Sequence, residues 1–420
     1  RRRRCSPEMT APQRQQPRTS RVLVIVATLV TCACAVLLGA VVIDPPSRGD
    51  RPHAAAGATS TTAGRAGDRD VEPGPGTLLE TRQWTSAAGG VSGRWVRYLT
   101  ADDSGRSLAA SAVVFVPTGV PPQRGWQVVA LGHGSVGINT ECGPSLTGNL
   151  AGMTAAVRRY LDRGMAVTVA DYPGLGTSPG SHPYLDSYAA ARSMIDSVRA
   201  LRAVFPHVSS TWVVHGISQG GGAAWAAAEI AADYAPDLRL RGAVAQVPST
   251  DKSYLVDKAV NGVLSVEQQG ILQWLLESLS RGDDLDLDDL RTPALAAVWN
   301  DLSRCGGDPA RELALQSVSA SDFIPADRVV ADRLRALLDP MSPPHGPNGS
   351  PMLILYGGDD RFLDRGGIEE SIRSACTWGS SITVDYQPAA GHLTIDTTSI
   401  WPFVQQVLHG EPVPNDCSEW

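Results

Sequence analysis

The stretch at residues 213–222 constrains the fold of this chain more than any other segment. It reads VVHGISQGGG, with an apolar β-like run before Ser218 and an Ala-rich helical run after it. A serine on so tight a strand-to-helix turn is lifted clear of the sheet, and small residues two positions before and after it prevent a clash. The free N–H groups of the following helix could bind an oxyanion. The context predicts a nucleophile elbow, with an ordinary glycine-rich turn as the alternative in a chain of 42 glycines.

Apolar strand-like runs and helical runs alternate along most of the chain. The strands are expected at residues 95–99, 110–116, 127–131, 166–170, 211–215, 242–246, 352–356 and 382–386, and the helices at residues 150–163, 184–204, 221–234 and 401–408. Such alternation predicts an α/β fold with a mostly parallel, doubly wound sheet. The early strands have no helices between them, so we expect them to form an antiparallel edge.

One long segment interrupts this alternation. Between about residues 249 and 340 no clear strand is present, while leucines recur at helical spacing through residues 272–279. We expect a helical insertion that forms a cap over the active site. A helical subdomain that only packs on the core is the alternative.

A serine hydroxyl needs a base to take its proton, and that base needs an acid to orient it. In folds with this type of elbow, the acid and then the base follow the serine along the chain. The expected strand at 352–356 leads into Asp359 and Asp360, and the spacing from Gly357 favours Asp360 as the acid. Asp359 is the alternative, and both residues could simply cap a turn. His392 follows a glycine in the loop after the last expected strand, so it is the predicted base.

An oxyanion in such a site needs two backbone N–H donors. Gln219, directly after the predicted nucleophile, should supply one of them. The other should come from the loop after the third expected strand, where Ser135 is the favoured donor and Gly134 the alternative. His133 in that loop and His215 just before the elbow are expected to have packing roles rather than to act as bases.

The N-terminal part of the chain has the pattern of an export signal. Residues 22–43 form an unbroken apolar run, long enough to span a bilayer, and several arginines precede it. Residues 1–43 are therefore expected to be an export segment, either a signal-anchor or a cleaved signal peptide. Both alternatives place the rest of the chain outside the cytoplasm, extracellular or anchored by one span on the outer face of the cytoplasmic membrane. Residues 44–77 are rich in Pro, Gly, Ala, Ser and Thr, which predicts a flexible linker.

The body of the chain beyond residue 43 keeps an even number of cysteines, namely Cys142, Cys305, Cys376 and Cys417. An even number in an exported protein predicts two disulfides, with buried free thiols as the alternative. No Cys-x-x-Cys spacing is present, so no metal site is expected. The whole chain has a net charge of −7, although residues 1–43 are basic, so the body is acidic. An acidic body argues against nucleic acid as a partner.

Six further motifs are spread over most of the chain. They are GHGS at 132–135, CGPS at 142–145, DYPGLG at 171–176, HPY at 182–184, APDL at 235–238 and GEP at 410–412, followed by Cys417. Together with the elbow they resemble the secretory lipase family of α/β-hydrolases, and the resemblance covers about residues 78–417. It implies an α/β-hydrolase catalytic domain over that range. Gly143, where the family more often has alanine, is a minor departure. A membrane anchor would be a larger one, because the family is usually secreted free.

The resemblance also implies an activity and a set of site residues. The family hydrolyses acyl esters, commonly triacylglycerols, without a metal or an organic cofactor. Its catalytic triad corresponds to Ser218, Asp360 and His392 here, in agreement with the chain order. The resemblance further implies the disulfides Cys142–Cys305 and Cys376–Cys417.

The sequence thus predicts a serine carboxylester hydrolase, a lipase or esterase, whose substrate is an acyl ester or a lipid such as an acylglycerol. The alternative is a peptidase or another acyl hydrolase on the same scaffold, but peptidases of this fold usually carry a propeller or a different cap, and the sequence contains neither. A non-catalytic surface protein would be expected to lack a member of the triad, and none is missing. The sequence indicates no oligomeric state.

Overall fold

The computed structural model describes residues 73–87, 90–178, 180–282 and 285–420. The expected export segment at residues 1–43, and the expected linker up to residue 72, lie outside these ranges. Within the ranges, no helix is long and apolar enough to cross a membrane.

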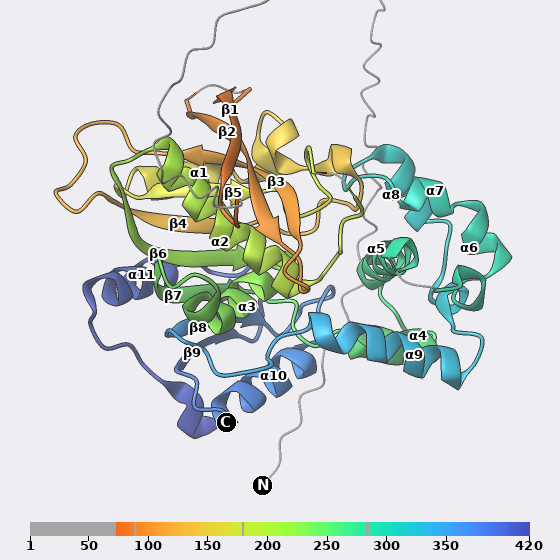
Figure 1. The fold of residues 1–420 in the computed structure, drawn as a ribbon. Helices are drawn as coiled ribbons and strands as arrows, with labels where there is room; N and C mark the ends of the chain where they lie inside the picture. The colour runs from red at the N-terminus through yellow and green to blue at the C-terminus, as the bar shows by residue number, and fades with distance from the viewer. Residues whose placement is uncertain (1–72, 88–89, 179, 283–284) are drawn as a thin grey trace, which may run out of the picture. The chain divides into compact units, whose positions relative to one another are not determined.

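A nine-stranded sheet forms the centre of the protein (Figure 1). Its strands are β1 (Leu78–Thr85), β2 (Ser92–Ala101), β3 (Ser107–Phe115), β4 (Trp126–Gly132), β5 (Ala166–Ala170), β6 (Val208–Ile217), β7 (Arg239–Gln246), β8 (Met352–Gly357) and β9 (Ile382–Gln387). They lie in the order β1-β2-β3-β5-β4-β6-β7-β8-β9. All pairs from β5 onward are parallel, whereas β1, β2 and β3 form an antiparallel edge. The predicted α/β fold with a mostly parallel sheet and an antiparallel edge is confirmed.

Helices cover both faces of the sheet, and each face has its own apolar core. The helices outside the long insertion are α1 (Thr154–Leu161), α2 (Ser187–Val204), α3 (Gln219–Tyr234), α10 (Arg365–Thr377) and α11 (Ile400–His409). Residues of α2, α3 and α10 share one core with Trp212 and Val214 of β6, and residues of α1 and α11 share the other with Val213. This division follows from the two-residue period of a strand, which turns neighbouring side chains to opposite faces. It also explains why β6 is buried on both faces from Trp212 to Gly216.

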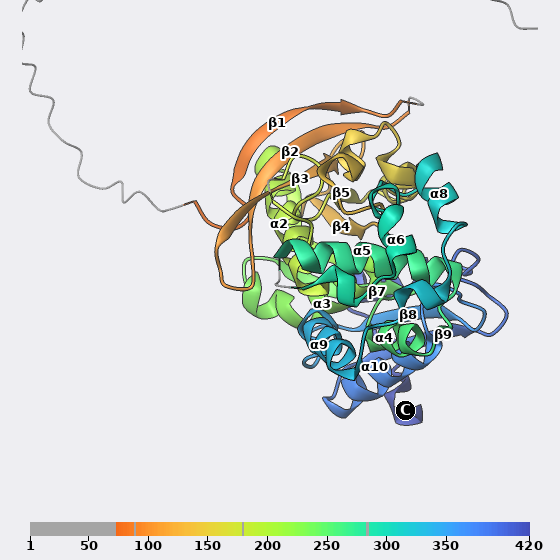
Figure 2. The ribbon, with the colours of Figure 1, turned by 90° about the vertical axis from the view of Figure 1, so that its right-hand side faces the viewer.

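The segment between β7 and β8 is helical in all its regular structure within the described residues. Its helices are α4 (Ser253–Val260), α5 (Val266–Gly282), α6 (Pro293–Ala297), α7 (Trp299–Leu302), α8 (Pro309–Leu315) and α9 (Arg328–Leu338). We refer to α4–α9 as the helical insertion. It lies to one side of the sheet in Figure 1 and in front of it in Figure 2. Its apolar core surrounds α5 and includes Ile138, Tyr184 and Leu185 of the body. The insertion is therefore packed on the loops that follow β4 and β5.

Two disulfides link distant parts of the chain. Cys142–Cys305 joins the loop after β4 to the helical insertion, and Cys376–Cys417 joins α10 to the C-terminal segment. These are the pairs that the family resemblance implied.

One strand was not predicted from the sequence. In β1 the side chains from Leu79 to Gln83 are exposed and only Trp84 is buried, so the strand has no apolar alternation to reveal it. It is held by its antiparallel pairing with β2 at the edge of the sheet.

Candidate active site

The turn between β6 and α3 places Ser218 in a backbone conformation that L-amino acids rarely adopt. Its φ is 59° and its ψ is −114°. Backbone hydrogen bonds hold it there. Its N–H donates to the carbonyl of Gln246 at 2.9 Å, and its own carbonyl accepts from the N–H groups of Gly222 and Ser249 at 3.1 Å each. Strain of this kind persists only where the surroundings over-determine it, and it is concentrated at functional sites.

Glycines on both sides of Ser218 are required by packing. A Cβ atom placed on Gly216 would overlap the carbonyl oxygen of Gly220. A Cβ atom placed on Gly220 would overlap the backbone of Gly132 at the end of β4. The Gly-x-Ser-x-Gly pattern is therefore a steric necessity of this turn, since the backbones of β4, β6 and α3 meet there.

The predicted acid and base contact each other. Asp360, in the loop after β8, has its Oδ2 2.7 Å from Nδ1 of His392, in the loop after β9. The Oδ1 of Asp360 accepts from the backbone N–H groups of Phe362 at 2.8 Å and Leu363 at 3.0 Å. The His392 ring stacks on the Phe362 ring, with 4.6 Å between centroids. With its Nδ1 directed to the carboxylate, the imidazole presents Nε2 as its remaining proton acceptor.

The two candidate aspartates differ in how far their side chains are buried. The side chains of Asp360 and His392 are only 3% and 7% exposed. Asp359 is exposed, and its backbone N–H donates to the carbonyl of Ala390 at 3.0 Å. Asp360 is thus the residue of the pair that can orient His392.

Ser218, Asp360 and His392 all lie at the carboxyl edge of the parallel sheet, after β6, β8 and β9. Among the described residues, the structure contains no hydrogen bond between Ser218 and His392. Catalytic hydrogen bonds are often long before substrate binds and shorten in the complex. The structure therefore joins the acid to the base and places the serine at the same edge.

The loop after β4 lies against the elbow. The backbone N–H of Gly220 donates to the carbonyl of His133 at 3.0 Å, and a Cβ atom placed on Gly134 would lie 3.6 Å from the Cβ of Ser218. Within the part of the chain that is described, the backbone N–H groups of Ser135 and Gln219 donate to no backbone carbonyl. Neither N–H group is therefore used in the backbone hydrogen bonding of the described residues.

His133 and His215 have the packing roles expected of them. His133 stacks on Tyr172, with 4.1 Å between centroids, and its Nδ1 bonds the carbonyl of Gly134 at 2.7 Å. The Nδ1 of His215 bonds the hydroxyl of Tyr160 at 2.9 Å. Burial lowers the pKa of each imidazole to about 4, which keeps both rings neutral at pH 7.

Three residues near the site had no role assigned from the sequence. The Nε2 of His182 lies 3.0 Å from Nε2 of the Gln219 side chain, and the hydroxyl of Tyr184 lies 2.6 Å from Oγ of Ser135. Asp171 is fully buried and accepts from Ser111 Oγ at 2.5 Å and from the Ser145 N–H at 2.7 Å.

Burial raises the pKa of the Asp171 carboxyl to about 6, and its hydrogen bonds oppose that rise. All three residues lie in the DYPGLG and HPY motifs. The motifs singled out these two segments in the sequence, but the side-chain contacts of the three residues could be found only from the folded structure.

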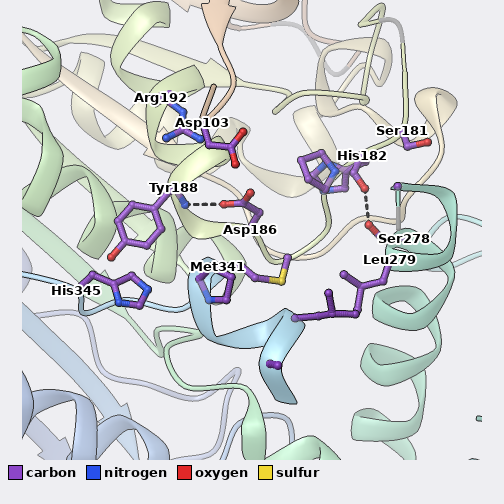
Figure 3. A pocket seen from close by; sticks show the side chains of 15 residues that line it. Asp103, Ser181, His182, Asp186, Tyr188, Arg192, Ser278, Leu279, Met341 and His345 are labelled. Carbon is purple, nitrogen blue, oxygen red and sulfur yellow. Dashed lines mark hydrogen bonds between the residues drawn. The ribbon is translucent and has the colours of Figure 1, made fainter. Parts of the chain in front are cut away.

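A cavity of about 610 Å³ lies between the start of α2 and the helical insertion (Figure 3). The body contributes His182, Asp186 and Arg192, and the insertion contributes Ser278 and Leu279. Ser218, Asp360 and His392 do not line the cavity. One of its lining residues, His182, contacts the elbow, because its ring bonds the side chain of Gln219. Among the described residues, no group of three or more His, Cys, Asp and Glu side chains is placed to hold a metal ion.

Comparisons with known proteins agree with the geometry. The secretory lipase family matches the chain over residues 145–288. The structure is similar to lipase A from Candida antarctica in its closed state, with a TM-score of 0.65 and 16% identity over 82% of this chain and 84% of the other. It is also similar to the rice cell wall degrading esterase LipA from Xanthomonas oryzae, with a TM-score of 0.61 and 19% identity over 80% of this chain and 97% of the other. The comparison with curated proteins finds no match.

The two structural likenesses show the α/β-hydrolase fold. The family match confirms the resemblance over residues 145–288, a range that includes the elbow and the DYPGLG, HPY and APDL motifs. The match to a secretory family and the two disulfides together indicate an exported protein.

Proposed function

We propose that this chain is a hydrolase of the lipase and esterase class, and that it cleaves acyl esters by transferring the acyl group to Ser218. One observation carries the proposal. The buried Asp360–His392 pair lies at the same sheet edge as a serine whose backbone is held in a strained turn. An imidazole that is held by a carboxylate and lies beside a serine is the arrangement that activates a hydroxyl for nucleophilic attack.

In the proposed reaction, Oγ of Ser218 attacks the carbonyl carbon of the ester while Nε2 of His392 takes the hydroxyl proton. Asp360 stabilises the imidazolium that forms. The backbone N–H groups of Gln219 and Ser135 donate to the oxyanion. Donors at this position stabilise the charge that develops in the transition state and so lower the activation barrier. The imidazolium then protonates the leaving alcohol, and a water molecule, deprotonated by His392, releases the acid and regenerates the hydroxyl of Ser218.

The proposed substrates are acylglycerols or similar esters with an apolar acyl chain. The helical insertion would act as the cap, since it packs on the loops after β4 and β5. Its side of the 610 Å³ cavity includes Leu279 and Leu337, and Met341 lines the cavity just after the end of α9. If the acyl chain lies there, each buried methylene contributes about 0.8 kcal/mol, or roughly a fourfold gain in kcat/KM, until the pocket is full.

The test of the mechanism compares the protein with its Ser218→Ala variant on p-nitrophenyl esters. The native protein should hydrolyse them, and a fluorophosphonate should label Ser218 in peptide mass spectrometry. Ser218→Ala should stay folded and lose roughly 10³-fold or more in kcat/KM. Ser197→Ala, which removes a buried hydroxyl on α2 away from the elbow, is the control and should keep full activity. A folded Ser218→Ala protein with near-normal turnover would rule out this mechanism.

The test of the cap uses a series of acyl-chain lengths. Leu337→Gln should weaken hydrolysis of long-chain esters and leave acetyl esters almost unaffected. Leu313→Gln, on an exposed side chain of the same insertion, is the matched control. An identical chain-length profile for all three proteins would show that this part of the insertion is structural only.

We propose further that residues 1–43 direct export. N-terminal sequencing of the exported protein distinguishes the two forms of this proposal. A mature chain that begins just after Ala35 or Ala40 indicates a cleaved signal peptide, and retention of the whole of residues 22–43 in the membrane fraction indicates an anchor.

A further inference from the structure

The HPY motif, residues 182–184, contacts both of the proposed oxyanion donors through its side chains. The ring of His182 bonds the side-chain amide of Gln219 at 3.0 Å, and the hydroxyl of Tyr184 bonds Oγ of Ser135 at 2.6 Å. Gln219 begins α3 and Ser135 lies in the loop after β4, so one short segment contacts two residues from different elements. Neither contact involves the backbone N–H groups that would bind the oxyanion.

The same motif is attached to the helical insertion through its main chain. Oγ of Ser278 on α5 donates to the carbonyl of His182 at 2.6 Å and accepts from the N–H of Tyr184 at 2.9 Å. Figure 3 shows the first of these bonds at the wall of the cavity. A second contact lies close by, where the Tyr184 ring meets the Trp274 ring edge-on at 5.7 Å between centroids. Since Trp274 and Ser278 are one turn apart on α5, the helix and the motif are joined at two points.

The hydrogen bonds of the HPY motif are shielded from water, so a displacement of the motif would be transmitted to the residues that it contacts. His182, Tyr184 and Gln219 are at most 2% exposed. The Nδ1 of His182 bonds the carbonyl of Pro173 at 2.7 Å, so it carries the proton and Nε2 accepts from the Gln219 amide. Buried hydrogen bonds of this kind are costly to break, since no water replaces the lost partner.

The Gln219 side chain has few other restraints. Its Oε1 has no hydrogen-bond partner among the described residues. The bond to His182 is therefore the polar contact that orients this side chain at the start of α3. A shift of His182 would move Gln219, whose backbone N–H is one of the two proposed donors.

We propose that His182 and Tyr184 are positioning residues for the oxyanion hole, and that Ser278 couples them to the helical insertion. A substrate chain that displaces α5 thereby changes the alignment of both N–H donors, so the insertion affects the rate of acyl transfer as well as substrate binding. This inference rests on the proposed function.

The experiment uses Tyr184→Phe and Ser278→Ala, each of which removes one hydroxyl. We expect kcat to fall about 10-fold or more with KM nearly unchanged, a smaller loss than the roughly 10²- to 10³-fold that follows deletion of an oxyanion donor itself. The affinity for a boronic acid, which mimics the tetrahedral intermediate, should fall by the same factor as kcat/KM. His182→Gln, which keeps an acceptor for the Gln219 amide, should retain more activity than His182→Ala.

Two controls make the same chemical changes elsewhere. Tyr98→Phe removes a buried hydroxyl that bonds Ser193 between β2 and α2, and Ser371→Ala removes one that bonds Gly367 within α10. Both control variants should be less stable than the native protein and should keep its kcat. If Tyr184→Phe and Ser278→Ala match these controls in kcat and in boronic acid affinity, the coupling is refuted.

Labelling of Ser218 by a fluorophosphonate separates this result from a failure of the proposed function. Labelling in the native protein supports the nucleophile whatever the HPY variants show. Its absence, together with absent ester hydrolysis, would refute the proposed function and this inference together.

Discussion

Removal of each disulfide tests how the two bridges share the stability of the fold. The Cys142–Cys305 bridge closes 163 residues and the Cys376–Cys417 bridge closes 41. Cross-linking restricts the unfolded chain more when the closed loop is longer, and the chain-entropy relation gives about 5 kcal/mol for the first bridge and about 4 kcal/mol for the second at 25 °C. The two loops do not overlap in the sequence, so the two losses should be independent.

The measurement compares two double variants, Cys142→Ala with Cys305→Ala and Cys376→Ala with Cys417→Ala. Each removes two sulfur atoms, so the difference between them reports mainly on loop length. We expect urea unfolding to give a loss larger by about 1 kcal/mol for the longer loop. Activity should also fall at a lower urea concentration in that variant, because Cys305 ties the helical insertion to the loop after β4. Equal losses, or the reverse order, would show that contacts in the folded state, rather than loop entropy, set the contribution of these bridges.

Three further predictions concern single residues. Asp360→Asn should lower kcat by several orders of magnitude and Asp359→Asn only slightly, since the first alone contacts the base; a larger loss at Asp359 in ester hydrolysis would reverse the assignment. Gly216→Ala should abolish activity and lower the melting temperature, because its Cβ overlaps the backbone of the elbow, and full activity would contradict the steric argument. Burial lowers the pKa of Lys252 to about 7, although the charges of Asp186 and Asp251 oppose this shift. Between about pH 7 and 10 the unfolded state therefore binds more protons than the folded state, and the contribution of Lys252 makes the free energy of unfolding rise with pH. Lys252→Met should remove that rise in urea unfolding at pH 6.5 and 9.5, and equal slopes in the two proteins would refute it.

The elbow and the order of the acid and base could be predicted from the sequence because both are local or ordered along the chain. The glycines at positions 216 and 220 are dictated by the sterics of one turn, and the turn is bounded by a strand and a helix that the pattern reveals. Asp360 and His392 follow two consecutive strands of a parallel sheet, whose carboxyl ends lie at one edge. Their spacing in the sequence therefore already indicated a shared site.

The contacts that only the tertiary structure decided join residues with no regular spacing. His182 and Gln219 are 37 residues apart, Tyr184 and Ser135 are 49 apart, and Ser278 and His182 are 96 apart. Each depends on how the segment after β5 is placed between the sheet and α5, which is set by packing of side chains from many elements. A periodic pattern records the environment of one element at a time. It does not indicate which residues these side chains contact, because their partners depend on the assembled fold.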